Sequence, residues 1–191
     1  TGIGFQPNFV WVKLGTFADR EAVFRHNSDV GDISNSFIET TDSANWIQAF
    51  EADGFQVGTA TEVNTGTETY YYIAMKTSAG RFSQGIYTGN GTNNRIITGV
   101  GFQPDLVIIK NDTTAVSATF VTNKITVGNS HHFDNELDLE DEIKALETDG
   151  FKVGTGTRVN TNLDTFMYMA WKNSGTAGSA TGAGLLSSLS F

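Results

Sequence analysis

Residues 98–110 have the sequence TGVGFQPDLVIIK, and residues 1–13 have the related sequence TGIGFQPNFVWVK, with 8 of 13 positions identical. In both segments two glycines and a proline precede a short apolar run. The residue before a proline is held in extended backbone, and runs rich in β-branched and aromatic side chains are typical of buried strands. Each segment therefore predicts a turn followed by a buried strand.

A second pair of matching segments extends this repeat. Residues 51–76 and 147–172 share 15 of 26 positions, including the sequences DGF and VNT. The offset is 97 residues for the first pair and 96 for the second, so the unit is a domain and not a short solenoid repeat. We expect two tandem domains, residues 1–80 and 81–175, followed by a flexible tail, residues 176–191.

The composition limits the function classes. The 191-residue chain has a formal net charge of -9, which disfavours nucleic acid as a partner because phosphate binding requires a basic surface. Cysteine is absent, which excludes disulfides and thiolate metal sites. No apolar run is long enough for a membrane span. The first residue is threonine, as expected of a processed protein or of a piece of a longer product.

The residue patterns predict an all-β protein made of two tandem homologous domains of the β-sandwich or jelly-roll kind. Asp-Gly pairs at residues 53–54 and 149–150, between apolar flanks, predict hairpin turns. Residues 70–76 and 166–172 alternate with apolar side chains on both faces, which predicts central strands.

Two segments break this pattern. In residues 41–51 the apolar residues Trp46, Ile47 and Phe50 follow a spacing that also fits a helix. Residues 137–147 have a similar spacing. We expect short helices at these two places.

The ordered motifs GFxPDLVxxK, DGFxxG and VNxxxxxYxxxAxK make the chain resemble a β-domain family of unknown function. Residues 87–110 and the DGF and VNT segments carry the resemblance, which covers most of both copies. That family recurs in phage structural and tail-associated proteins and in some secreted microbial proteins. The resemblance implies a role on a virion surface or outside the cell, and it supplies no catalytic residues.

The two ends of the repeat differ. Strand-like residues 85–88 and 95–97 precede the second copy, and the first copy has no such lead. The chain ends in LLSSLSF, residues 185–191, an alternating apolar segment that would be unfavourable in water if exposed. We expect this segment to add as a strand to the open edge of the first copy in a neighbouring subunit, or to fold back on its own chain. The expected interface residues are Leu185, Leu186, Leu189 and Phe191 in the tail, with Phe5 and Val10 in the acceptor.

An acidic run is the main candidate for metal binding. Asp134, Glu136 and Asp138 alternate, so on a strand they would face one side and could bind Ca²⁺. The favoured alternative is a solvated acidic edge that discourages strand pairing. Adjacent His131 and His132 would point to opposite faces of a strand, so a metal site that uses both with Asp134 would require a loop.

No hydrolase, metalloprotease or nucleotide-binding motif occurs, and the pairs Glu51/Asp53 and Glu147/Asp149 are expected to be structural because both copies keep them. The sequence favours a non-enzymatic structural protein, either a capsid decoration or tail component of a virion or a subunit of an extracellular filament. Its partners would be copies of itself or other virion proteins, without a cofactor. The alternative is a secreted carbohydrate-binding module in which sugars stack on Trp11, Trp46, Tyr87 or Trp171.

Overall fold

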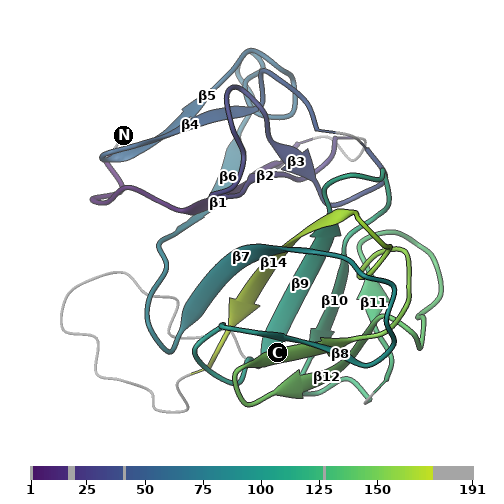
Figure 1. Ribbon diagram of the computed structural model, residues 1–191. Coiled ribbons are helices and arrows are strands. Elements are labelled where there is room, and N and C mark those ends of the chain that lie inside the picture. The colour runs from purple at the N-terminus through teal and green to yellow at the C-terminus, as the bar shows by residue number, and fades with distance from the viewer. Residues whose placement is uncertain (1, 17–19, 41, 127, 174–191) are drawn as a thin grey trace.

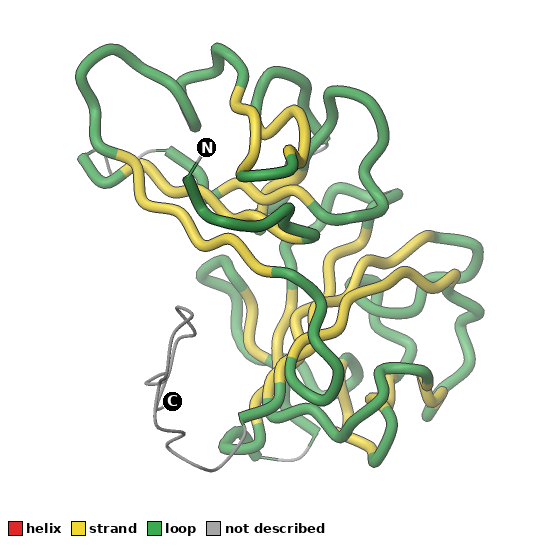
Figure 2. Tube along the Cα trace, turned by 90° about the vertical axis from the view of Figure 1, so that its left-hand side faces the viewer, coloured by secondary structure: helices red, strands yellow, loops and turns green. Residues whose placement is uncertain are grey.

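The computed structural model describes residues 2–16, 20–40, 42–126 and 128–173. All the regular structure in these ranges is β, in 14 strands that pair in antiparallel fashion (Figure 2). The all-β prediction is therefore confirmed. The described ranges contain no helix that could cross a membrane.

The first copy forms two sheets. The larger sheet has the order β3-β2-β1-β6 and contains β1 (Phe9–Leu14), β2 (Val23–Arg25), β3 (Asn35–Ser36) and β6 (Tyr70–Met75). The smaller sheet is the hairpin of β4 (Ile47–Glu51) and β5 (Gly54–Val57).

The second copy forms the same two sheets with one more strand in each. Its larger sheet has the order β11-β10-β9-β14-β7 and contains β7 (Phe82–Thr88), β9 (Leu106–Asn111), β10 (Thr119–Thr122), β11 (His131–His132) and β14 (Thr165–Trp171). Its smaller sheet has the order β12-β13-β8 and contains β8 (Arg95–Thr98), β12 (Ile143–Glu147) and β13 (Gly150–Val153).

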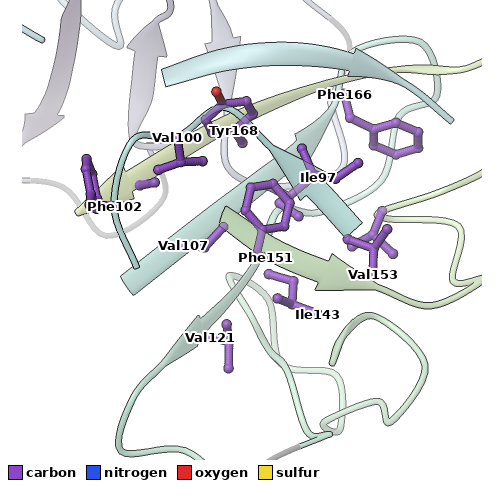
Figure 3. Close-up of a cluster of buried hydrophobic side chains, with 13 residues drawn as sticks. Ile97, Val100, Phe102, Val107, Val121, Ile143, Phe151, Val153, Phe166 and Tyr168 are labelled. Carbon is purple, nitrogen blue, oxygen red and sulfur yellow. The ribbon is translucent and has the colours of Figure 1, made fainter. Parts of the chain in front are cut away.

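The four sheets are stacked as layers, with the two larger sheets in the middle (Figure 1). One apolar core fills the sandwich of the first copy, another fills that of the second copy, and a third lies between the two larger sheets. Figure 3 shows the core of the second copy, where Phe151 of the small sheet lies against Tyr168 of the large one. The chain is thus a tandem of two β-sandwiches joined face to face.

The middle core explains why the strand sequences are apolar on both faces. In β14, Phe166, Tyr168 and Ala170 enter the core of the second copy, whereas Met167 and Met169 enter the core between the copies. Burial of apolar surface is the main force that holds such layers together. The strand β14 is central, as predicted, because β9 and β7 pair with its two edges. The same prediction is wrong for its counterpart β6, which pairs with β1 alone and lies at the edge of its sheet.

The Asp-Gly turns are confirmed, and their aspartates have a second role. In each copy the carboxylate accepts hydrogen bonds from two backbone N–H groups of the glycine-rich lead-in. The distances are 2.9 Å from Gly2 and 2.6 Å from Gly4 to Asp53, and 3.1 Å from Gly99 and 2.6 Å from Gly101 to Asp149. These bonds account for the retention of the aspartates as a structural feature.

The two predicted helices are wrong. Residues 47–51 and 143–147 are strands β4 and β12, each the first strand of a hairpin. The pairing register shifts between Ile47 and Ala49 and again at the equivalent place in β12. A β-bulge of this kind inserts an extra residue, which breaks the period of two and makes the apolar spacing look helical.

Candidate functional site

The outer edge of β6 is the feature that most distinguishes the first copy from the second. Strand β14, the counterpart of β6, pairs with β9 on one side and with all seven residues of β7 on the other. Strand β6 pairs with β1 alone. The same holds in the small sheets, since β13 pairs with β12 and β8 whereas β5 pairs only with β4. Within the described ranges, the first copy thus has an open edge in both of its sheets.

The open edge leaves aromatic side chains in water. Tyr72 is 52% exposed, whereas its counterpart Tyr168 is 7% exposed, and Tyr71 is 67% exposed, whereas its counterpart Met167 is 1% exposed. Edge strands that face solvent are usually short or carry charges or proline. Strand β6 has the sequence YYYIAM, which contains no charged residue and no proline, so its edge is unusually favourable for pairing.

The aromatic pair beside β6 has the same geometry as its counterpart in the second copy. The rings of Phe55 and Tyr72 make an edge contact at 5.2 Å, and those of Phe151 and Tyr168 make the same contact at 5.4 Å. In the second copy Tyr87 of β7 contacts one member of this pair, with its ring 6.1 Å from that of Phe151. Within the described ranges, the first copy has the pair but no strand in the place of β7.

The strand β7 shows which side chains fit such an edge. Gly85 pairs with Tyr168, and a Cβ atom on Gly85 would lie 2.7 Å from the hydroxyl of Tyr168. Phe82, at the other end of β7, is buried in the core between the copies. A strand that covers β6 in the same way needs a small residue opposite Tyr72 and an apolar residue opposite Met75.

The expected interface residues fall in three groups. Leu185, Leu186, Leu189 and Phe191 lie outside the described residues. Phe5 is half-buried in the lead-in to β1. Val10 does not belong to the open edge, because β1 is paired on both sides and Val10 is fully buried in the core of the first copy.

The acidic run does not form the expected row. Residues 133–138 are a loop after β11, so Asp134, Glu136 and Asp138 do not alternate on a strand face. Asp138 pairs with His131 instead, whereas Asp134 and Glu136 gather with the buried His132. His131 is half-buried and pairs with Asp138, whereas His132 is buried and pairs with Glu142, as expected of neighbouring residues on a strand.

A basic residue that the sequence did not single out completes this group. The guanidinium of Arg158 lies 2.6 Å from Glu136, 3.6 Å from Asp134 and 3.5 Å from Glu142. Burial lowers the pKa of Arg158, but the hydrogen bond with Glu136 and the other carboxylates outweigh it and raise that pKa. We call His132, Asp134, Glu136, Glu142 and Arg158 the charged cluster.

A shallow pocket of about 140 Å³ lies where the two copies meet. It is lined by Thr40, Asp42, Asn111, Asp112, Thr113, Thr114 and Ala115. Burial raises the pKa of Asp112 to about 6 and lowers that of the neighbouring Lys110 to about 8. The volume is well below that of typical small-molecule pockets, so this pocket does not favour a substrate or cofactor site.

The aromatic residues considered for sugar binding do not form an exposed platform. Trp46 is buried, Trp11 and Trp171 pack in the core between the copies, and Tyr87 stacks on Phe166. The aromatic residues that were predicted to stack on sugars in a carbohydrate-binding module are therefore not placed to do so.

Comparisons with known proteins give one match. A family model described as Domain of unknown function (DUF7483) matches residues 77–191, which begin just before β7 and contain the second copy. Neither the curated proteins nor the solved structures contain a match. Since the matched segment is more than half of the chain, the protein belongs to the family described as Domain of unknown function (DUF7483).

Proposed function

We propose that this protein is a non-catalytic assembly protein, a component of a virion surface or of an extracellular filament, whose subunits join by addition of a β-strand at β6. The observation that carries this proposal is the contrast between β6 and β14, two equivalent strands of which one is covered and the other open. Strand addition satisfies the backbone groups of such an edge, and alternate side chains of the added strand supply specificity.

The donor that we propose is residues 185–191 of a neighbouring subunit. When LLSSLSF is aligned with FSQGIYT of β7, Leu185 takes the place of Phe82, Ser188 that of Gly85 and Leu189 that of Ile86. The small residue then lies opposite Tyr72 and an apolar residue lies opposite Met75, as the edge requires. The alignment thus gives the donor a definite antiparallel register.

The same segment could also pair with β6 of its own chain. Trp171 at the end of β14 contacts Met75 at the end of β6, with 3.1 Å between the indole Nε1 and the sulfur. The residues between, 174–184, can span about 36 Å when extended. Donation to a neighbour is a head-to-tail contact that produces rings or open filaments, whereas donation within the chain leaves a monomer.

The test compares the intact chain with a version that ends at Gly184, by light scattering after gel filtration and by electron microscopy. We expect rings or filaments only for the intact chain, and a folded monomer for the shortened one. Adding a synthetic peptide with the sequence of residues 185–191 to the shortened chain should give a one-to-one complex. Monomers in both samples, with the peptide bound, would place the donor within its own chain, and the absence of peptide binding would refute the donor itself.

A glycan screen of the shortened chain separates the alternative function. Tyr71 and Tyr72 are exposed aromatics, but they follow one another on β6 and so point to opposite faces of the sheet. They do not form one stacking surface, and we therefore expect no glycan to bind.

A further inference from the structure

We propose that His132, Asp134 and Glu136 bind a divalent transition-metal ion of the Zn²⁺ or Mn²⁺ class. The three residues lie at the edge of the large sheet of the second copy, His132 on β11 and the two acids in the loop that follows. One possible ligand atom from each lies within 4.8 Å of the others, a separation that short metal–ligand bonds can bridge with small side-chain movements.

The buried histidine is the observation that points to a ligand. The side chain of His132 is fully buried, and its Nε2 lies 2.9 Å from a carboxylate oxygen of Glu142, which is itself buried. Since a carboxylate can only accept, Nε2 carries the hydrogen, and the lone pair of neutral His132 is on Nδ1. The Glu142 contact thus fixes the tautomer that leaves Nδ1 available.

The lone pair on Nδ1 of His132 has no hydrogen-bond donor beside it. Nδ1 of His132 makes no hydrogen bond and lies 3.9 Å from an oxygen of Asp134, so two acceptors face one another. Buried polar atoms normally have a partner, and an unpaired one requires an explanation. A cation between Nδ1 and Asp134 would give Nδ1 the partner that it lacks, while Oδ1 of Asp134 keeps the hydrogen bond that it accepts from the backbone N–H of Glu136. The arrangement of a carboxylate, a histidine and then a metal is the usual way in which proteins orient a histidine ligand.

The charges of the cluster also favour a divalent ion. With His132 neutral, the three carboxylates of Asp134, Glu136 and Glu142 face one positive charge among the described residues, that of Arg158. The remaining charge is two negative units. The side chain of Glu136 is 53% exposed, so it can turn from Arg158 toward an ion without disturbing the core.

The ligand types select the class of metal. Imidazole nitrogen with carboxylate oxygens suits Zn²⁺ and Mn²⁺, whereas Ca²⁺ prefers a shell made of oxygens alone. We therefore expect Ca²⁺ to bind more weakly than Zn²⁺, in contrast to what the acidic run alone suggested.

The first copy shows that the fold does not need this cluster. At the equivalent positions it has Ser36, Ile38, Thr40, Trp46 and Glu62. There the indole of Trp46 donates to Glu62 at 3.2 Å, in place of the contact between Glu142 and Arg158. The same loops close around a single carboxylate and an indole, so the charged cluster is a property of the second copy alone.

The test is calorimetric titration of the chelator-treated full chain with Zn²⁺, Mn²⁺ and Ca²⁺, with metal content measured after dialysis. We expect one Zn²⁺ per chain, a higher unfolding temperature when it is bound, and at least a tenfold weaker Kd in Asp134→Asn. Glu140→Gln is the control, since Glu140 is exposed and outside the cluster. Each variant must unfold at the temperature of the parent protein in chelator.

Two further measurements keep the test decisive. The ring of His132 should shift in the NMR spectrum when Zn²⁺ is added, and that of His131 should not. Unchanged Zn²⁺ affinity in Asp134→Asn, or a shift at His131 instead, would place the metal elsewhere. If no Zn²⁺ binds to the full chain, the proposal is wrong.

Discussion

The ring of Phe37 stacks on that of Phe133, with 4.6 Å between centroids and 25° between planes, and the two residues are counterparts in the two copies. Met75 and Trp171 are counterparts as well, and they also touch. Contact between equivalent residues is what a two-fold arrangement produces, as in a symmetric dimer. The two copies therefore pack as a pseudo-dimer within one chain.

The contact of Phe37 should dominate the stability of this interface. Phe37 is 2% exposed and touches the rings of Trp11, Phe24 and Phe133. We expect Phe37→Ala to lower the free energy of unfolding by about 3–5 kcal/mol, because it leaves a cavity in the core between the copies. Denaturation in urea measures the change. Leu137→Ala, at a residue 86% exposed, is the control and should change it by less than about 0.5 kcal/mol; equal effects of the two changes would contradict the expectation.

The carboxylate of Asp53 should hold the start of the chain in place. Hydrogen bonds from Gly4 and Gly2 lower its pKa, so this stabilisation is present above pH 3.8 and is lost as the pH falls through the lower folded value. In Asp53→Ala we expect the amide hydrogen of Gly4 to exchange with solvent faster. Glu51→Ala is the control, since the Glu51 side chain is not part of the pair of bonds. An unchanged hydrogen-exchange rate at Gly4 in Asp53→Ala would show that the two hydrogen bonds to Asp53 do not order the lead-in.

His26 should make the protein sensitive to acid. Burial lowers its pKa to about 4, so the folded state disfavours the charged ring that the unfolded chain acquires near pH 6.5. The stabilising effect is complete above pH 6.5 and is lost as the pH falls toward 4. NMR titration of the ring should give a midpoint near 4, and the difference in stability between the parent protein and His26→Gln should shrink over that range. A midpoint near 6.5 would mean that the ring is hydrated.

Asp29 should have the opposite pH dependence. Burial raises its pKa to about 7, although the backbone N–H of His26 donates to its carboxylate at 2.8 Å. A raised pKa in an acid means that stability is greatest below pH 3.8 and decreases as the pH rises to 7. The carboxyl carbon signal of Asp29 should therefore titrate near neutral pH. A midpoint near 4 would show that its hydrogen bonds, and not its burial, decide the charge.

The register of the proposed donor strand can be tested by replacing a small residue with a large one. Ser188→Trp should abolish assembly, because a large side chain opposite Tyr72 cannot fit the place that Gly85 fills beside Tyr168. Ser179→Trp adds the same side chain outside the donor and should assemble like the parent protein. The molar mass from light scattering reports both. Normal assembly of Ser188→Trp would exclude the proposed register.

Most of the fold could be predicted because the repeat marks what the scaffold needs. The Asp-Gly hairpins, the strands after GFQP and the central strand β14 all follow from local patterns. The strands β4 and β12 could not, because a bulge changes the period of their side chains. The position of Val10 away from the open edge also escaped prediction, because it depends on β6 pairing with β1 from more than sixty residues away.

The charged cluster was only half visible in the sequence. Asp134 and Glu136 lie in an acidic run, but Arg158 comes from a turn between β13 and β14 and carries no periodic signal. The difference between the copies was the one available clue, since Arg158 replaces Glu62 and Glu142 replaces Trp46. In each copy one of these two positions holds an acid and the other holds a hydrogen-bond donor. Positions that exchange these roles between the copies are expected to be in contact.

Strand β7 makes the two ends of the molecule different. The two copies are related by an approximate two-fold, yet β7 closes one of the two equivalent edges and leaves the other open. If both edges were open, subunits could add on either side and the assembly would have no defined polarity. If subunits join through β6 as proposed above, the uncovered β6 lies at one end of the array and the donor segment at the other, so a terminating partner could recognise one end and leave the other free to grow.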